Sequence, residues 1–245
     1  MPHNGAVTST RTPAGRLAVA RTGLVVGVLV GLNLADHLLH WDTLWLGPLG
    51  ALALLGYARW SGLSWAELGL ARHTHGRGMR WGLAVVGVVA VVYAVGVAIP
   101  LTRTAFLDVR YHLPSAKALL TAFVVIPLGT VLLEEVAFRS VLWGMLHRHA
   151  RTGWVLAGSS VLFGLWHLLP AISTASSTAF GAVTGGLGAS GPLLAVAATV
   201  VFTTGGGLVA GELRRRSGSV LSSVGMHWAT NGLGVLVGVL AWRLV

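Results

Sequence analysis

A succession of long apolar runs is the feature that most restricts how this chain can fold. An α-helix needs about 20 mostly apolar residues to cross a bilayer. The sequence offers seven such runs, the second of them short, at residues 17–39, 44–57, 81–100, 119–146, 154–169, 192–209 and 220–244. It therefore predicts an all-α fold: a polytopic integral membrane helical bundle of about seven transmembrane helices, within a range of six to eight.

Composition agrees with a lipid environment. Hydrophobic residues make up 54% of the chain and charged residues only 10%, against about 25% charged residues in an average soluble domain. The formal charge of +10 would suit a nucleic-acid partner if the arginines formed one stripe. They are instead spread over the joints between runs, so we expect the lipid bilayer, and no nucleic acid, as the partner of these charges. Cysteine is absent, which excludes disulfides and thiol catalysis.

The distribution of basic residues predicts an orientation, because cytoplasmic joints carry the excess of Lys and Arg. It predicts a multi-pass plasma-membrane protein with a cytoplasmic N-terminus and an external C-terminus. The joint at residues 102–117 also carries basic residues, so the span count could be wrong by one. No small-residue cleavage site follows the first run, which is expected to remain as an anchor. The residues that carry the pattern are Arg11, Arg16, Arg21, Arg59, Arg72, Arg77, Arg80, Arg148, Arg151, Arg214, Arg215 and Arg216.

Three segments outside the runs have their own expectations. Residues 1–15 are polar and contain Pro and Gly, which predicts a disordered tail. Residues 64–70 have apolar side chains at helical spacing, which predicts a short amphipathic helix lying at the membrane interface. Residues 173–191 are rich in Gly, Ser, Thr and Ala, which favours a flexible outer loop over a regular helix.

Two adjacent acidic residues, Glu134 and Glu135, lie inside the apolar stretch 116–146 of a chain with only seven acidic residues. A charge near the middle of a bilayer is costly, so it is retained mainly when it is paired or functional. Arg139 follows Glu135 by four residues, a spacing that brings two side chains together on one helix face. We expect a Glu135–Arg139 ion pair with a structural role, which leaves Glu134 without a local partner.

Two other runs carry polar residues. Phe163 and His167 end the fifth run, and Phe163 is expected to pack in the core or against lipid. His227 and Asn231 lie four residues apart in the seventh run, so a helix places both on one face. At 1.5 Å per residue, Glu134 and His167 lie ~20 Å from the cytoplasmic edge, and His227 and Asn231 ~12 and ~18 Å from it. The sequence therefore predicts an intramembrane polar site at one depth.

The order of these motifs points to a family. The sequence reads Glu-Glu-x-x-x-Arg at 134–139, Phe-x-x-x-His at 163–167 and His-x-x-x-Asn at 227–231. In this it resembles the CPBP intramembrane proteases, which include CAAX prenyl endopeptidases and bacteriocin-processing or immunity proteins. The resemblance covers roughly residues 119–234, and residues 66–70 also look like the family. It implies three parts: the tail at 1–15, N-terminal transmembrane helices with the interfacial helix at 16–115, and a catalytic core at 116–245.

The resemblance implies hydrolysis of peptide bonds inside the membrane. Glu134, helped by His167, would activate water, since an apolar environment makes a carboxylate a stronger base. His227 and Asn231 would stabilise the negative charge that develops on the carbonyl oxygen. The expected partner is a membrane-bound or prenylated peptide or protein substrate, although no residue identifies it.

The same residues leave open whether a metal ion takes part in the reaction. Glu134, His167 and His227 would give a catalytic zinc three protein ligands and leave a position for water. The chain lacks the His-Glu-x-x-His motif that favours zinc more strongly. Zinc-bound water and glutamate-activated water are therefore alternatives.

Two functions without proteolysis are also compatible with the sequence. An immunity or partner protein of the same family would keep the polar site without turnover. A small transporter would use Glu134, His167 and His227 as a proton or ion relay, but no internal repeat of the kind common in transporters relates the two halves.

Overall fold

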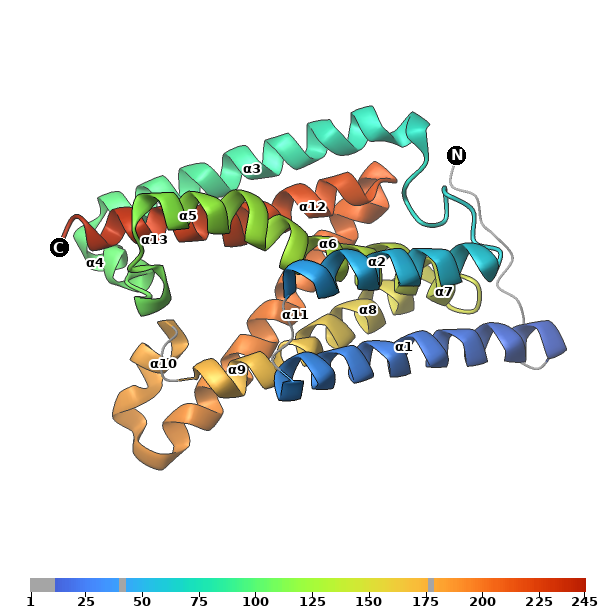
Figure 1. The fold of residues 1–245 in the computed structure, drawn as a ribbon, viewed down its shortest axis with the longest axis horizontal. Helices are drawn as coiled ribbons and strands as arrows, with labels where there is room; N and C mark the ends of the chain where they lie inside the picture. The colour runs from blue at the N-terminus through green and yellow to red at the C-terminus, as the bar shows by residue number, and fades with distance from the viewer. Residues whose placement is uncertain (1–11, 40–42, 176–178) are drawn as a thin grey trace.

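Helices are the only regular elements in the part of the chain that the computed structural model describes, residues 12–39, 43–175 and 179–245. They form the predicted all-α membrane bundle (Figure 1). The α-helices are α1 Pro13–Leu39, α2 Thr43–Trp60, α3 His75–Ala98, α4 Pro100–Arg103, α5 Ser115–Leu120, α6 Leu132–Glu134, α7 Trp143–His147, α8 Thr152–Trp166, α9 Leu168–Thr174, α10 Ala179–Thr184, α11 Gly191–Ser217, α12 Val220–Trp228 and α13 Gly234–Trp242. Short 3-10 turns are η1 Arg72–Thr74, η2 Thr104–Phe106, η3 Val109–Tyr111 and η6 Gly185–Ser190, and π-helical segments are η4 Thr121–Val131, η5 Glu135–Leu142 and η7 Ala229–Leu233.

Six helical segments of the described residues are long and apolar enough to cross a membrane, the lower end of the expected range. They are Pro13–Leu39, Arg72–Ala98, Ser115–His147, Thr152–Thr174, Gly185–Ser217 and Val220–Trp242. The second predicted run forms α2, which is not among them: it has 18 residues, with Pro48 inside and Arg59 in its last turn. At 1.5 Å per residue α2 is about 27 Å long, slightly less than the hydrocarbon core of a bilayer.

The arginine-rich joints gather at one end of the bundle. Figure 1 shows α1 beginning at the right-hand end, where α2 also ends, α3 begins, and α7 turns into α8. The turn between α11 and α12 lies at the same end, whereas α13 ends at the other. This clustering is the one that the charge pattern predicts; the side of the membrane that it faces stays a prediction.

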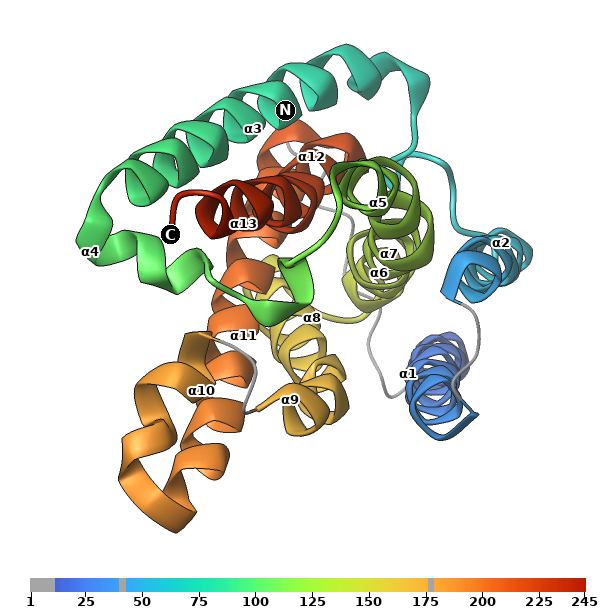
Figure 2. The same cartoon turned by 60° about the vertical axis from the view of Figure 1, so that its left-hand side comes forward.

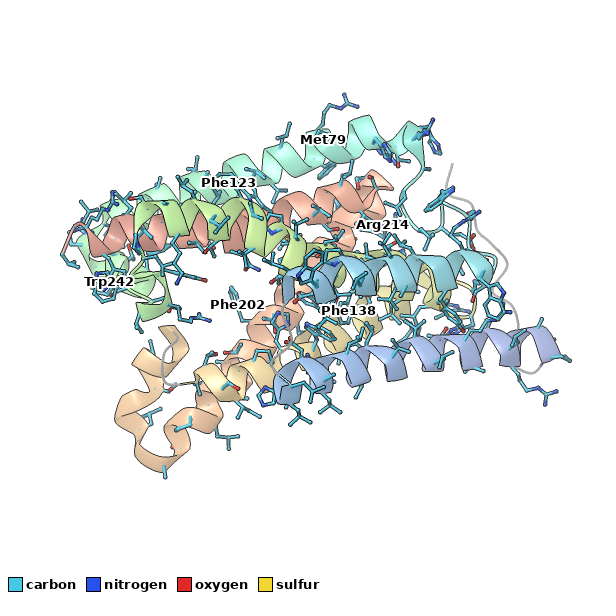
Figure 3. The ribbon with its side chains drawn as sticks, viewed as in Figure 1. Met79, Phe123, Phe138, Phe202, Arg214 and Trp242 are labelled. Atoms are coloured by element: carbon cyan, nitrogen blue, oxygen red, sulfur yellow. The ribbon has the colours of Figure 1, made fainter. Side chains whose placement is uncertain are left out.

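The segment from α5 to α7 is the centre of the bundle. α2 packs on one side of it and α12 on another, as Figure 2 also shows. A hydrophobic core fills the contact between α1, α2, η5 and α8; its largest fully buried side chain is Phe138, labelled in Figure 3. The outer helix α3 instead exposes valines such as Val91 and Val92. A buried interior with an apolar exterior is the arrangement expected of a protein surrounded by lipid.

Glycines allow α3 to approach α12 closely. A Cβ added to Gly225 would lie 2.9 Å from the Cα of Gly82, so only glycine permits this separation of the two backbones. Small residues at such contacts let membrane helices pack by van der Waals contact where no hydrophobic effect drives them together. The contact fixes the position of α12, which carries His227.

The segment at residues 64–70 is not the predicted interfacial helix. It forms consecutive turns, with Leu68 fully buried. Ser140 Oγ donates a hydrogen bond to the Leu68 carbonyl at 2.8 Å, and Arg214 Nη2 donates one to the Glu67 carbonyl at 3.1 Å. Leu68 therefore faces the bundle core, whereas Trp65 is 50% exposed. The partners that hold the segment come from distant spans, which the local pattern could not show.

Two other expectations are corrected in part. α1 begins at Pro13, so residues 13–15 of the predicted tail are helical, while residues 1–11 lie outside the described residues. The predicted outer loop contains α10 and the 3-10 turn η6. Within η6 the backbone is non-helical at Leu187 and Gly188. Residues 176–178 lie outside the described part of the chain.

Gly69 provides a test of this packing. Its φ is +71° and a Cβ would collide with the Arg214 guanidinium. We expect Gly69→Ala to destabilise the protein by more than the roughly 1–2 kcal/mol cost of left-handed backbone, because Arg214 must also move. Thermal unfolding in detergent measures the effect. Gly76→Ala is the matched control, since Gly76 is helical and a Cβ there meets no atom within 4 Å. An equal effect of the two substitutions would contradict the expectation.

Candidate active site

The carboxylate of Glu134 lies at the meeting point of three spans. Glu134 ends α6 and is buried, with 7% of its surface exposed. Its Oε1 accepts a hydrogen bond from Trp166 Nε1 at 3.1 Å. Its Oε2 has no hydrogen-bond partner among the described residues. This oxygen lies 3.8 Å from His167 Nε2 and 3.7 Å from His227 Nε2.

The other nitrogen of each imidazole determines what faces Glu134. His167 Nδ1 lies 2.9 Å from the Phe163 carbonyl, and His227 Nδ1 lies 2.9 Å from Glu135 Oε1. A carbonyl and an ionised carboxylate only accept hydrogen bonds, so both Nδ1 atoms must donate. In the neutral imidazole the Nε2 atom is then an acceptor. Three acceptor atoms therefore converge, at separations too long for direct hydrogen bonds.

A break in the fourth counted span places His167. α8 ends at Trp166, and His167 has φ −85° and ψ 0° before α9 begins. Pro170 has no N–H to return to the Trp166 carbonyl, one turn earlier. Asn33 Nδ2 of α1 donates to that carbonyl instead, at 3.0 Å. The Asn33 amide in the first span thus provides the Trp166 carbonyl with the hydrogen-bond donor that Pro170 lacks.

A second proline, on the other side of the site, also leaves a carbonyl that accepts a hydrogen bond from a side chain of another span. Pro127 lies within the π-helical segment η4. In a π-helix the N–H of residue 127 would bond to the Ala122 carbonyl, five residues earlier, but proline has no N–H. Trp228 Nε1 donates to Ala122 instead, at 2.9 Å. This bond fixes the residue next to His227 against η4.

Glu135 and Arg139 form the predicted ion pair. Arg139 Nη1 lies 3.4 Å from Glu135 Oε1, and both side chains are almost completely buried. The Arg139 guanidinium also lies 3.8 Å from the ring centroid of Phe163. Glu135 has a further partner, His227, that the local spacing could not show. The pair therefore joins η5 to α12 as well as neutralising two charges.

Phe163 packs in the core, as expected, and also lines the site. Its ring meets Phe138, His167 and His227 edge-on at centroid distances of 5.3, 4.7 and 5.8 Å. Together with the Arg139 contact, this packing fixes the orientation of both imidazoles.

A cavity of about 210 Å³ opens beside these side chains. Asn231 of η7 lines it together with His167 and His227. The structure therefore brings Glu134, His167, His227 and Asn231 into one region, as the depth argument predicts. The other lining residues are Tyr93, Glu135, Arg139, Phe163, Phe202, Thr203, Gly206, Ala210, Met226 and Thr230.

Residues 116–233 match the family model described as type II CAAX prenyl endopeptidase Rce1-like. This region belongs to the CAAX-type (CPBP) family of intramembrane proteases. The matched region contains Glu134, His167, His227 and Asn231. Neither the curated proteins nor the solved structures include a match to the chain.

Sequence reasoning missed two residues of this candidate site, Trp166 and Asn33. The indole N–H of Trp166 is a donor that a buried position must satisfy, and Trp166 directly precedes His167. An amide inside an apolar run, as at Asn33, is likewise a signal for an interhelical hydrogen bond. Both signals were in the sequence, but neither indicates the partner.

The donor types of Glu134, His167 and His227 suit zinc. Ligands about 2.0–2.2 Å from a tetrahedral zinc lie roughly 3.3–3.6 Å from one another, so the separations of 3.7–3.8 Å from Glu134 Oε2 to the two Nε2 atoms are slightly longer than a bound zinc requires. Within residues 12–39, 43–175 and 179–245, no group of three or more His, Cys, Asp or Glu could hold a metal ion. The chemistry below is therefore derived from the protein's own groups.

Loss of Arg139 tests the buried pair. We expect Arg139→Leu to destabilise the protein by roughly 3–5 kcal/mol, because it leaves the Glu135 carboxylate buried without its cation. Unfolding in detergent provides the measurement. The control is Arg216→Gln, which removes one exposed partner of Glu212 while Arg215 remains paired with it, and which should change stability little. Equal stability of the Arg139 variant and the wild type would contradict a structural role for this pair.

Proposed function

We propose that the chain is an intramembrane endopeptidase that hydrolyses a peptide bond in a membrane-associated protein or peptide. The observation that supports it most is the convergence of Glu134 Oε2 with two imidazole Nε2 atoms at 3.7–3.8 Å. A water molecule between them would donate its two hydrogens to Glu134 Oε2 and His167 Nε2. Membership of the CAAX-type protease family supports the same reaction class.

Glu134 is the proposed general base. Its Oε2 would take a proton from the water as the water oxygen attacks the carbonyl carbon of the scissile bond. His167 Nε2 would accept the second hydrogen bond of this water and so orient it. The Trp166 bond to Oε1 holds the carboxylate in a fixed rotamer, which leaves Oε2 for the reaction.

His227 and Asn231 are the proposed donors to the oxyanion. His227 can donate from Nε2 only as an imidazolium, because its Nδ1 proton already bonds to Glu135. The negative charge of Glu135 stabilises that cation, in the way that an acidic residue supports the histidine of a serine protease. The proton on Glu134 would then pass to the amine nitrogen as the C–N bond breaks, which regenerates the carboxylate.

Glu134→Gln should lower the rate of cleavage by about 10²–10⁴-fold, since the amide cannot accept the water proton. The measurement is cleavage of a fluorogenic peptide panel, prenylated and unprenylated, by detergent-purified protein. Glu212→Gln is the matched control, because Glu212 is exposed in α11 and pairs only with neighbouring arginines in the described structure. Wild-type cleavage that persists in the Glu134 variant would refute the proposal. If the wild type shows no cleavage and the Glu134 variant keeps the cellular phenotype, the chain is an immunity or partner protein. If the Glu134 variant instead loses ion flux, the chain is a transporter.

The same assay with a chelator tests the metal alternative. If Glu134 activates water by itself, a chelator should leave the rate unchanged. Loss of cleavage that zinc restores would instead assign a zinc ion to Glu134, His167 and His227. The unloaded protein then provides a second readout, since zinc binding should raise its melting temperature.

Asn231→Ala should lower kcat by about 10²–10³-fold, the usual cost of one oxyanion donor, with little change in KM. A stability measurement on the same variant separates this loss from unfolding. Thr230→Val is the control, because Thr230 lines the same cavity but its hydroxyl already donates to the His227 carbonyl. A KM effect without a kcat effect would assign Asn231 to substrate binding instead.

A further inference from the structure

A second cavity lies at the arginine-rich end, away from the candidate active site. It has a volume of about 340 Å³ and lies between the start of α1, the turn after α2, and the end of α7. Its polar lining residues are Arg21, Arg148 and Ser61. The remaining lining is apolar: Ala14, Leu17, Ala18, Leu63 and Met145.

The two arginines are not equally neutralised. Arg148 Nη2 lies 3.2 Å from Glu67 Oε1. Burial alone would raise the pKa of Glu67, but hydrogen bonds from Ser64 and Arg148 lower it overall, so Glu67 is ionised and balances Arg148. Arg21 has no carboxylate partner among the described residues; its Nη1 donates only to the Ser61 carbonyl, at 3.1 Å. The cavity therefore carries the net positive charge of Arg21.

Ser61 adds an unused polar group. Ser61 is 4% exposed, and its Oγ has no hydrogen-bond partner among the described residues. The serine carbonyl instead accepts from both Arg21 and Arg148. The Ser61 hydroxyl is buried, so the donor that the cavity offers to a ligand is the Arg21 guanidinium. A guanidinium is the donor expected for a phosphate group.

The surroundings favour a lipid phosphate over a free one. Trp60 at the end of α2 is 74% exposed, and the Arg21 guanidinium lies 5.5 Å from its ring centroid. Exposed tryptophans of membrane proteins concentrate at headgroup depth. Leu17, 52% exposed, continues the apolar half of the cavity along α1. A ligand with one anionic group and an apolar chain matches both halves.

We propose that this cavity binds the headgroup of an anionic phospholipid, with the phosphate at Arg21 and the acyl region against Leu17 and Ala18. Basic pockets between membrane helices are a known class of lipid site. The site is independent of the proposed peptidase reaction, because none of its lining residues lines the catalytic cavity.

Native mass spectrometry of the full-length protein in detergent tests the proposal, with phosphatidylglycerol, phosphatidylcholine and inorganic phosphate as probes. The wild type should retain phosphatidylglycerol more tightly than phosphatidylcholine. Phosphatidylglycerol should also raise the melting temperature, while inorganic phosphate at equal concentration should not. Arg21→Gln should weaken phosphatidylglycerol binding about tenfold or more, the usual effect of one lost charge-assisted hydrogen bond.

Two further variants make the result specific. Ala18→Leu keeps every charge but fills the cavity, and should weaken binding as well. Arg16→Gln removes the same charge from α1 at a position outside the lining, and should bind like the wild type. Equal weakening by Arg16→Gln and Arg21→Gln would overturn the proposal in favour of general surface charge. Unchanged binding by Arg21→Gln would also overturn it, and an equal shift with inorganic phosphate would assign a free-anion site.

Discussion

The buried contact between Glu135, Arg139 and His227 is the interaction on which the rest of the site depends. Glu135 Oε1 lies 3.4 Å from Arg139 and 2.9 Å from His227, so one carboxylate oxygen links two different spans. Inside a membrane an unpaired charge is expensive, and this cost forces η5 and α12 into a single register. That register in turn brings His227 Nε2 toward Glu134, the preceding residue. Two adjacent glutamates therefore divide their tasks: one holds the spans together, and the other is left available for chemistry.

Prolines contribute to the site by what they leave unbonded. Pro127 and Pro170 each remove a backbone donor within a span, and each freed carbonyl accepts from a side chain of another span, Trp228 or Asn33. In water such a carbonyl would find a solvent partner, but in lipid the protein must supply one. The breaks that reshape the backbone near Glu134 and His167 thus also generate interhelical bonds at the same places.

The sequence predicted what depends on local spacing or on overall apolarity. The bundle follows from the length of the runs, and the Glu135–Arg139 pair follows from a four-residue spacing on one helix. The depth of Glu134, His167, His227 and Asn231 could also be counted along the chain. Contacts between distant spans could not be predicted, because the sequence of one apolar run does not indicate which other helices it packs against. The bonds from Trp166 to Glu134 and from Arg214 to the turn at residues 64–70 belong to this class. The same limitation explains why residues 64–70 were expected to form a helix: the local pattern does not show that Ser140 and Arg214 hold this segment in turns.

The break between α8 and α9 has a consequence for how the bilayer acts on the site. His167 is the joint of these two helices, whereas Glu134 and His227 are fixed by η5 and α12. Phe163 of α8 holds the His167 imidazole through its carbonyl and its ring, so a change in the tilt of α9 would leave both separations from Glu134 in place. Helix tilt responds to the match between hydrophobic length and hydrocarbon thickness. The unwound residue would thus separate the geometry around Glu134 from changes in the thickness of the surrounding membrane.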